Sequence, residues 1–476
     1  MRFGLILAIN ARMLIGCGLL MLIPAMLDIF YQHNIVNAFI LSSGLTVSVG
    51  MLLYFLTPKT QDSLHPKEMF ITTTVMWMLY ALFAAIPFYL PPHPVSFTNA
   101  VFESVSGLTT TGATIFSNVD ELSMGTLFWR SMTQWFGGVG IIVVALIVLP
   151  DLRVGGMQFF ATESVLLSER INPTVRKSVR DILVYFLLLT VVCSVCLWWA
   201  GMSPFDAVNH AMTTISTGGF STHDASIAYY HNPLIEWIII VFMFIAGLPL
   251  VIGPNLLHKQ FYAIKNNMQI LTFIKLIVVS VCILGCVYGW HNLRTILFQV
   301  LSVITTTGYV VSDYNIWGPV AVALFMFLLV SGACTGSTSG GIKMFRFAII
   351  KRVLMQRMKS LIQPHAVFVA RYGDKTINAE IVDGVLFFLG LFSMTVIVSV
   401  LMLSALGLDY ITALSGTLTS VGNVGPALGN QIGPVQNFSV LPMEAKWILC
   451  VDMLLGRLEF TTVGAVFLPF LWRKNI

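Results

Sequence analysis

Four short stretches rich in threonine and glycine have the composition needed to surround a dehydrated cation with oxygen atoms. They are FESVSGLTTTGAT (102–114), NHAMTTISTGGF (209–220), FQVLSVITTTGYV (298–310) and SGTLTSVGNVGP (415–426). Glycine permits backbone conformations with positive φ, which can aim successive carbonyl oxygens along one axis. Threonine is stiff at its first side-chain torsion and adds a hydroxyl oxygen. Four such strands could replace the water shell of a cation, as the carbonyl rings of channel filters do.

The recurrence of this motif predicts one structural unit repeated four times. We align Gly112, Gly218, Gly308 and Gly425, which lie 106, 90 and 117 residues apart. In the fourth stretch Gly422 is an alternative to Gly425. The alternative to the whole alignment is a set of four unrelated polar patches between helices. The predicted filter residues, three from each stretch, are Thr110, Thr111, Gly112, Ser216, Thr217, Gly218, Thr306, Thr307, Gly308, Asn423, Val424 and Gly425.

The chain is too apolar for a soluble protein. Of its 476 residues, 57% are hydrophobic and only 10% are charged, and the mean hydropathy is +0.86. This composition indicates an all-α polytopic membrane protein with little length left for a soluble domain. The net charge of +5 does not suggest nucleic-acid binding. We therefore expect the protein to contact membrane lipid and not to bind nucleic acid. The seven cysteines lie in apolar or small-residue runs, which favours buried membrane side chains over a metal or disulfide site.

Hydropathy divides the chain into ten membrane spans and four re-entrant pore segments. Residues 1–66 hold two N-terminal helices outside the repeat. Each repeat has an apolar helix, a pore segment too short to span, and a second apolar helix. The repeats cover residues 67–150, 151–258, 259–375 and 376–476. The spans are predicted at about 4–30, 37–57, 69–90, 126–149, 181–201, 233–257, 268–290, 319 onward, 380–407 and 443–470.

The basic residues agree with this topology. All but four of the 26 lysines and arginines fall at the termini or in the loops 57–68, 150–180, 258–275 and 343–375. With re-entrant pore segments these regions share one side of the membrane, whereas full spans would put basic loops on both sides. The positive-inside rule therefore places both termini in the cytoplasm. The exceptions are Arg130, Arg294, Lys446 and Arg457.

Two features outside the four stretches could control passage. Arg457 lies near the middle of the last span, where an arginine costs roughly 2.5–3.5 kcal/mol and suggests a function. Its alternative role is a structural ion pair with Asp452 or Glu459. The stretch SGACTGSTSGGIK (331–343) suggests a broken helix that lines a cavity, or alternatively a helix-packing face of small residues. The predicted gate residues are Gly332, Gly336, Gly340, Gly341, Lys343 and Arg457.

Further residues are expected to support the pore segments. Glu103 lies nine residues before Gly112, and the matching positions are Asn209, Gln299 and Gly416. We expect Glu103 to hydrogen-bond behind the filter rather than to coordinate a cation. The acidic residues of the outer loops, which either concentrate cations at the mouth or are simply solvated, are Asp120, Glu121, Asp224 and Asp313. The glycines expected to permit close helix packing near the filter are Gly137, Gly138 and Gly140.

The motifs TTTGAT, FGGVGII (136–142), GGFSTHDAS (218–226), NVGPALG (423–429) and LLGRLEF (454–460) resemble the Trk/Ktr/HKT superfamily of potassium uptake proteins. The two extra N-terminal helices and the length are similar to its TrkH/TrkG branch, and the resemblance covers nearly the whole chain. It implies a potassium ion bound at the filter residues, with no covalently bound cofactor. It also implies that Gly425 is the fourth filter glycine, that 331–343 is a gating loop under the filter, and that Arg457 faces the pore.

The resemblance further implies the assembly and the location. Members of the superfamily are homodimers in which each protomer has its own pore. A cytoplasmic nucleotide-binding regulatory subunit of the TrkA type docks on the inner face, and part of the basic stretch 343–375 could receive it. A bacterial inner membrane, crossed many times by the chain, is the implied location.

Three functions compete as explanations of these features. The first is a potassium-selective, channel-like uptake subunit whose gate is opened by the regulator. The second is a proton- or sodium-coupled secondary potassium transporter, which would need acidic or histidine residues at the midplane. Glu103, Asp452 and Glu459 are the candidates for that role, and they form no obvious relay. The third is a membrane enzyme, but the chain has no HExxH or GxSxG motif and no paired carboxylates with a histidine. We favour the first function and expect no enzymatic activity.

Overall fold

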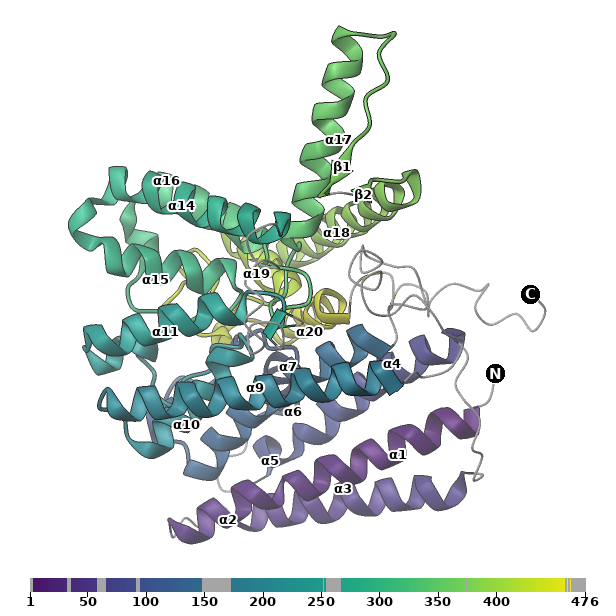
Figure 1. The fold of residues 1–476 in the computed structure, drawn as a ribbon. Helices are drawn as coiled ribbons and strands as arrows, with labels where there is room; N and C mark the ends of the chain where they lie inside the picture. The colour runs from purple at the N-terminus through teal and green to yellow at the C-terminus, as the bar shows by residue number, and fades with distance from the viewer. Residues whose placement is uncertain are drawn as a thin grey trace.

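The computed structural model of the chain describes residues 3–31, 36–57, 66–90, 95–147, 173–250, 252–253, 267–373, 375–458, 460 and 463. Its described part is nearly all helical, as predicted (Figure 1). Long helices run across the molecule, and short helices and loops meet near its centre (Figure 1). This arrangement places the threonine- and glycine-rich stretches inside a shell of apolar helices.

The N-terminal helices are α1 Phe3–Leu20, α2 Leu22–Phe30 and α3 Val36–Leu56. The first predicted span is thus divided into two helices at Met21. Pro24 lies three residues later, and proline has no backbone N–H to donate in a continuous helix. Helix α1 packs on α3, and α2 packs on α7. The buried carboxylate of Asp28 accepts the N–H of Gly125 at 2.7 Å. It thereby satisfies one of the backbone donors left free at the start of α7.

Each repeat contains one short pore helix. These helices are α6 Phe97–Leu108, α10 Pro204–Ile215, α15 Leu293–Ile304 and α19 Tyr410–Gly422. Twelve or thirteen residues extend about 18–20 Å at 1.5 Å per residue, whereas a bilayer core is about 30 Å thick. The side chains of Ser96, Ser203 and Asp409 cap three of them. The pore helices cannot cross the membrane, which confirms the re-entrant prediction.

The apolar helices that flank the pore helices correspond in position to the remaining predicted spans. They are α4 Pro66–Ala84 with α5 Ile86–Tyr89, α7 Met124–Ile147, α9 Pro173–Trp199, α11 Pro233–Ala246, α14 Met268–Tyr288, α16 Pro319–Val330, α18 Ala379–Ala405 and α20 Met443–Leu458. Two of them, α11 and α16, are only 14 and 12 residues long. Helix α11 ends earlier than the predicted residue 257 because Pro249 follows it closely. The predicted end of the last span, residue 470, lies outside the described residues.

Short 3₁₀ turns join these helices. They are η1 Val119–Glu121, η3 Ser226–Tyr230, η4 Trp290–Asn292, η5 Tyr314–Trp317 and η6 Phe438–Val440. The loop 119–121 reaches the loop 221–226 through the bond from the N–H of Val119 to Asp224 Oδ1, 2.7 Å long. Loops of different repeats therefore contact one another beyond the filter.

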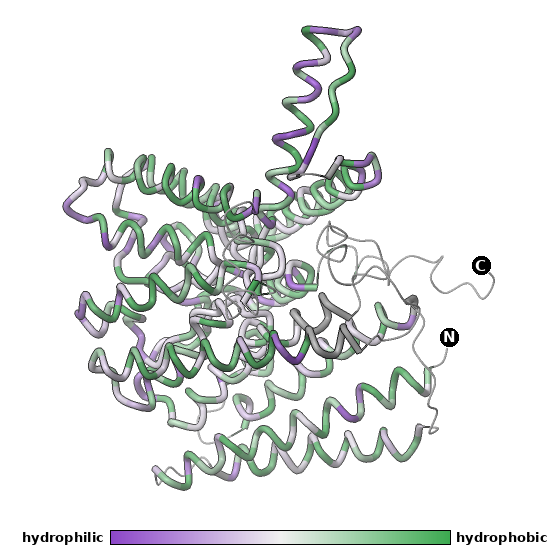
Figure 2. The backbone as a smooth tube through the Cα atoms, in the orientation of Figure 1, coloured by the Kyte–Doolittle hydropathy of each residue, from purple (hydrophilic) through white to green (hydrophobic). Residues whose placement is uncertain are grey.

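The helices on the outside of the molecule consist mostly of hydrophobic residues (Figure 2). In the part of the chain that the structure describes, six helices are long and apolar enough to cross a membrane. Their large side chains point outward, and Phe55 and Trp199 are 79% and 81% exposed. A protein surrounded by water would bury such side chains, whereas contact with lipid tails carries no such cost. The chain is a multi-pass membrane protein.

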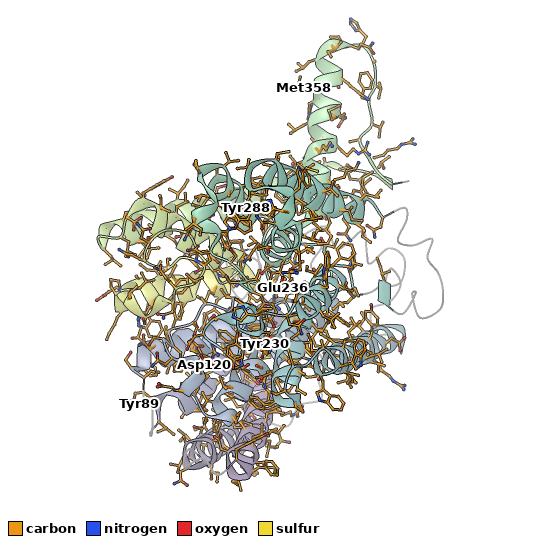
Figure 3. The ribbon with its side chains drawn as sticks, turned by 90° about the vertical axis from the view of Figure 1, so that its left-hand side faces the viewer. Tyr89, Asp120, Tyr230, Glu236, Tyr288 and Met358 are labelled. Carbon is orange, nitrogen blue, oxygen red and sulfur yellow. The ribbon has the colours of Figure 1, made fainter. Side chains whose placement is uncertain are left out.

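Part of the predicted basic loop 343–375 is ordered secondary structure. Residues Met344–Ile362 form α17, and β1 Arg371–Tyr372 pairs antiparallel with β2 Lys375–Thr376. Helix α17 projects from the bundle, and Met358 lies far out on it (Figures 1 and 3). Its base is anchored because the buried Arg346 guanidinium lies 3.6 Å from the ring centroid of Phe388 in α18. The prediction of a loop was wrong here. The many lysines and arginines of α17 interrupt the helical spacing of its apolar residues, so the sequence pattern does not indicate a helix.

Candidate functional site

The four stretches share one backbone conformation directly after their pore helices. Each begins with a residue in the left-handed region and reaches a glycine with positive φ two residues later. The first set is Thr110, Thr217, Thr306 and Asn423, with φ of 54°, 54°, 58° and 53°. The second set is Gly112, Gly219, Gly308 and Gly425, with φ of 83°, 77°, 81° and 104°. This repeat of dihedral angles is the structural counterpart of the sequence repeat.

The structure corrects the alignment of the second loop by one residue. Gly219, not Gly218, has the positive φ that Gly112 and Gly308 have. The counterparts of Thr110, Thr111 and Gly112 in the second loop are therefore Thr217, Gly218 and Gly219. The sequence STGG offers two adjacent glycines, and only the backbone conformation distinguishes them.

The predicted residue Ser216 consequently lies one position before the filter. It occupies the place of Thr109, and its hydroxyl donates to the carbonyl of Met212 four residues earlier, as Thr109 donates to Val105. In the fourth loop Gly425 has the shared positive φ, and Gly422 is still the last residue of α19. The choice of Gly425 therefore agrees with the backbone.

The four glycines close a ring of loops. A Cβ atom added to Gly112 would strike the carbonyl oxygen of Gly218 in loop 2, and one added to Gly219 would strike the carbonyl oxygen of Thr307 in loop 3. In the same way Gly308 abuts the carbonyl oxygen of Val424 in loop 4, and Gly425 abuts that of Thr111 in loop 1. The loops thus contact one another in the order 1, 2, 3, 4 and back to 1. Such a closed order requires that they surround one axis.

The amide groups of the loops bind back to their own pore helices. Thr111 N–H donates to Ser106 O at 2.9 Å, Gly218 N–H to Thr213 O at 2.8 Å, and Thr307 N–H to Ser302 O at 2.9 Å. Val424 N–H donates to Thr419 O at 2.9 Å. Because these N–H donors are already used, the oxygen atoms are the polar backbone groups that these residues have left for a ligand. Oxygen-lined rings of this kind suit a cation that has lost its water.

Two side-chain oxygens of the ring are buried without a hydrogen-bond partner among the described residues. They are Thr110 Oγ1 and Asn423 Oδ1, and both residues are fully buried. The amide nitrogen of Asn423 is fixed, since it donates to Thr111 Oγ1 at 3.0 Å and to the carbonyl of Met453 at 2.9 Å. A buried polar atom without a partner is costly. Both oxygens therefore remain able to accept a hydrogen bond from water or to contact a cation.

The stretch 331–343 is an irregular loop between α16 and α17, as the broken-helix prediction required. It folds back on itself through a parallel bridge between Ser331 and Ile342. Gly336 and Gly341 have φ of 82° and 65°, and a Cβ on Gly332 would strike the carbonyl of Gly340. Three of the predicted gate glycines are thus required by turns or by close backbone approach. The rival interpretation, a continuous packing helix, is wrong.

This loop contacts the filter directly. Gly340 N–H donates to Thr306 Oγ1 at 2.7 Å, and Thr338 Oγ1 lies 3.1 Å from Thr217 Oγ1. A Cβ on Gly340 would also strike the carbonyl of Gly422 at the end of the fourth pore helix. The stretch 331–343 therefore binds the first residues of two filter loops and packs against a third. Thr338 and these contacts were not predicted, because they join residues that are far apart in the sequence.

Arg457 completes this layer. Its guanidinium donates to the carbonyl of Thr338 at 2.7 Å and to the carbonyl of Gly137 at 3.1 Å. Among the described residues it forms no ion pair with Asp452, whose carboxylate accepts the hydroxyl of Ser399 at 2.8 Å. Glu459, the other partner considered, lies outside the described residues. Lys343, at the end of the loop, donates to Ser339 O.

The three other basic residues that lie outside the predicted cytoplasmic loops also have specific partners. Arg130 Nε donates to Glu103 at 2.8 Å, and Arg294 Nε donates to Glu236 at 2.7 Å. Lys446 Nζ donates to Asn99 Oδ1 at 2.8 Å and to Ser439 O at 2.9 Å. These charges are held by local partners, so they do not contradict the predicted topology.

Glu103 lies behind the first filter loop, as predicted, but its counterpart in the second repeat differs. With Gly219 as the reference, the residue nine positions earlier is His210 rather than Asn209. Glu103 accepts the hydroxyl of Thr114, and His210 Nε2 lies 3.0 Å from Ser221 Oγ. Both bonds join this pore-helix position to the residue two places after the filter glycine. The corrected register therefore reveals an equivalent brace in the two loops.

The predicted close-packing glycines separate into two kinds. A Cβ on Gly137 would strike the carbonyl of Leu108, and one on Gly138 would approach Ser216 Cβ to 2.8 Å. Gly140 has more room, since its nearest neighbour would be Trp77 at 3.7 Å. Gln134, one turn earlier in α7, was not predicted as a supporting residue. Its amide bridges the carbonyl of Gly218 and the N–H of Phe220 at 2.7 and 3.0 Å.

An outer cavity of about 370 Å³ opens above the filter glycines. Residues from all four loops line it, and of the predicted acidic residues Asp224 is among them. Asp120 lies beside it, because His223 Nδ1, in the cavity wall, is 2.5 Å from Asp120 Oδ1. His223 Nε2 is 3.8 Å from Asp206 Oδ2, and the ring stacks on Tyr229. Histidine thus bridges two carboxylates at the mouth.

We expect the protein to lose stability as the pH rises, through this bridge. Partial burial alone would lower the pKa of His223, but the nearby carboxylates of Asp206 and Asp120 outweigh burial and raise the pKa above its ordinary value. The stabilisation by protonated His223 is complete below the pKa of histidine in the unfolded chain, about 6.5. It is lost as the pH rises through the higher pKa of His223 in the folded protein. The thermal unfolding midpoint of purified protein, measured from about pH 6 to 9, should fall more for the wild type than for His223→Gln. Parallel pH profiles for the two proteins would contradict this.

Comparison with known proteins agrees with the architecture. A family profile described as "TrkH: Cation transport protein" matches residues 33–294 and 290–474. The Trk system potassium uptake protein TrkI of Halomonas elongata is 40% identical over 99% of this chain and 98% of its own length. The Trk system potassium uptake protein TrkH of Escherichia coli K12 is 35% identical over 95% of this chain and 96% of its own length.

A solved structure gives the same result. The crystal structure of the potassium transporter TrkH from Vibrio parahaemolyticus superposes with a TM-score of 0.90 at 30% identity. It covers 99% of this chain and 100% of the other. The relatives are transport proteins and not enzymes. The chain belongs to the TrkH family of cation transport proteins.

Proposed function

We propose that this chain is the potassium-selective, channel-like subunit of a Trk uptake system. The observation that carries the proposal is the closed ring of four loops, in which each filter glycine abuts a carbonyl of the next loop. The filter residues would be Thr110, Thr111, Gly112, Thr217, Gly218, Gly219, Thr306, Thr307, Gly308, Asn423, Val424 and Gly425. The relatives named as potassium uptake proteins support potassium as the ion.

The gate in this proposal is the layer formed by 331–343 and Arg457. The loop binds Thr217 and Thr306 at the start of the filter, and Arg457 holds the loop to α7 through Thr338 and Gly137. A positive charge at this depth opposes a cation, because Coulomb repulsion is strong where water is scarce. Opening would require the loop and Arg457 to move together.

The regulator would be a cytoplasmic nucleotide-binding subunit of the TrkA type, and the chain would act as a homodimer with one pore per protomer. We place both termini in the cytoplasm of a bacterium, on the strength of the basic loops. A membrane potential of about 100 mV supplies roughly 2.3 kcal/mol per charge. That energy favours uptake roughly fifty-fold without a coupling ion.

Ion-coupled transport is the rival mechanism. Its candidate groups do not make a relay in the described part of the chain, since Glu103 is bound to Arg130 and Asp452 is bound to Ser399. The third candidate, Glu459, lies outside that part.

The test is rubidium or potassium uptake by the purified chain in proteoliposomes under an imposed potential. We expect flux that follows the potential without any proton or sodium gradient. Flux that requires one of those gradients would support the coupled transporter. If the folded protein shows no cation flux alone, the same vesicles with the regulatory subunit and nucleotide decide whether the regulator is required or the function is wrong.

A further inference from the structure

A buried ion pair lies directly behind the outer ends of filter loops 1 and 2. Glu103 of α6 and Arg130 of α7 are joined by a bond of 2.8 Å between Oε1 and Nε, and their side chains are 0% and 2% exposed. A buried pair of this kind seldom adds stability over an apolar pair. The other hydrogen bonds of Glu103 and Arg130 indicate why this pair lies beside the filter.

The carboxylate of Glu103 holds the end of loop 1. It accepts the hydroxyl of Thr114 at 3.0 and 3.1 Å and the N–H of Ile115 at 2.9 Å. These residues are two and three places beyond Gly112. The carboxylate thus determines where the chain goes as soon as it leaves the filter.

The guanidinium of Arg130 holds the end of loop 2 and joins it to loop 1. It donates to the carbonyl of Ser221 at 3.0 Å and to Thr114 Oγ1 at 3.2 Å. It also lies 4.2 Å from the ring centroid of Phe220, which follows Gly219 directly. The two charges and their partners therefore form one brace across the boundary between the first two loops.

The other half of the ring is braced by neutral groups. Gln299 Nε2 donates to the carbonyl of Ser312 at 2.9 Å in loop 3. In loop 4 the hydroxyl of Ser415 bonds both the carbonyl and the N–H of Leu428, at 2.8 and 3.0 Å. The ionic brace is thus a feature of loops 1 and 2, where Arg130 also contributes to the wall of the outer cavity.

We infer that Glu103 and Arg130 are positioning residues that set the ion selectivity of the filter, with Glu103 also cancelling the charge that Arg130 brings to the cavity wall. The inference rests on the proposed function. Selectivity depends on oxygen ligands held at fixed spacing, and small displacements of the loops change which cation they suit. An unpaired guanidinium at the mouth would in addition repel the cations that enter.

The two single substitutions have different expected kinetics. Glu103→Gln leaves Arg130 unpaired, so the KM for potassium should rise roughly tenfold and discrimination against sodium should fall. Arg130→Gln leaves a negative charge at the same place, so discrimination should fall without a rise in KM. The double variant restores charge balance, but glutamine is too short to reach Ser221 and Thr114 together. Its KM should return toward the wild-type value while its discrimination stays low.

The matched control is Glu236→Gln. It breaks a second Glu–Arg pair, between Glu236 of α11 and Arg294 of α15, whose atoms are 2.7 Å apart. That pair joins the first turns of α11 and α15, and its arginine side chain is 38% exposed. We expect KM and selectivity in this control to equal those of the wild type.

The experiment measures radioactive rubidium uptake in proteoliposomes with increasing potassium or sodium as competitor. In parallel, thermal unfolding of each purified protein is recorded in potassium chloride and in sodium chloride. Wild-type protein without uptake and without a difference between the salts would count against the proposed function itself. If wild type discriminates and the folded Glu103 and Arg130 variants discriminate equally well in both assays, the positioning role is overturned while the function stands. If the single variants do not fold, the charge-balanced double variant decides in the same way.

Discussion

Replacement of Gly219 by alanine is expected to remove most of the selective cation uptake, while replacement of Gly218 leaves a larger part of it. Gly219 has φ of 77°, and its added Cβ would strike the backbone carbonyl of Thr307 in the next loop. A left-handed conformation costs an L-residue about 1–2 kcal/mol, and a backbone obstacle cannot rotate away. The combined effect should reduce uptake roughly tenfold or more.

Gly218 differs in both respects. Its φ is not positive, and its added Cβ would meet the amide of Gln134, which is a side chain rather than backbone. Gly218→Ala should therefore lose part of the Gln134 brace but keep the ring of loops. The measurement is potassium-competed rubidium uptake in proteoliposomes at equal protein density.

Gly384→Ala is the control for this pair, because no atom lies within 4 Å of a Cβ at that helical position. The opposite order of effects, with Gly218→Ala inactive and Gly219→Ala active, would restore the alignment that the sequence suggests.

Arg457→Ala is expected to raise uptake in the absence of the regulatory subunit, by roughly tenfold. Two effects act in the same direction. The substitution removes a buried positive charge, which in the proposed gate would repel a passing cation, and it removes the bonds that join Thr338 of the loop to Gly137 of α7. Flux without regulator, measured under an imposed potential, checks the prediction.

Arg457→Lys separates these two effects. Lysine keeps the charge, but its single ammonium group lacks the planar fork that bonds the two carbonyls at once. If repulsion dominates, the lysine variant should remain nearly closed, and if the bonds dominate, it should leak like the alanine variant. Unchanged flux in a well-folded alanine variant would remove Arg457 from the gate.

Several features of the site were open to prediction because they depend on local sequence. Hydropathy located the apolar helices, since each is a continuous apolar run, and the pore helices were too short to span. The Thr-Gly motif located the four loops, because the second positive-φ position of each loop, with φ of 77–104°, is occupied by glycine. The broken helix at 331–343 followed from its serines, threonines and glycines.

The projecting helix α17 marks one limit of such reasoning. Its lysines and arginines were interpreted as a topology signal, which they can be in a loop or in a helix alike. The choice between the two depends on its packing, including the contact of Arg346 with Phe388 in α18.

Composition, hydropathy and the recurring Thr-Gly motif thus determined the class, the spans and the fourfold repeat, because these reflect short-range chemistry along the chain. Only the tertiary structure decided that Gly219 rather than Gly218 meets loop 3, that Thr306 binds Gly340, and that Glu103 binds Arg130. Each of these contacts joins segments that are far apart in the sequence. How these segments are oriented relative to one another depends on the assembly of all four loops into a ring. The physical reason is that the atom which leaves no room for a side chain at Gly219 is a backbone carbonyl of loop 3. That carbonyl belongs to another repeat, so the sequence around Gly219 does not reveal it.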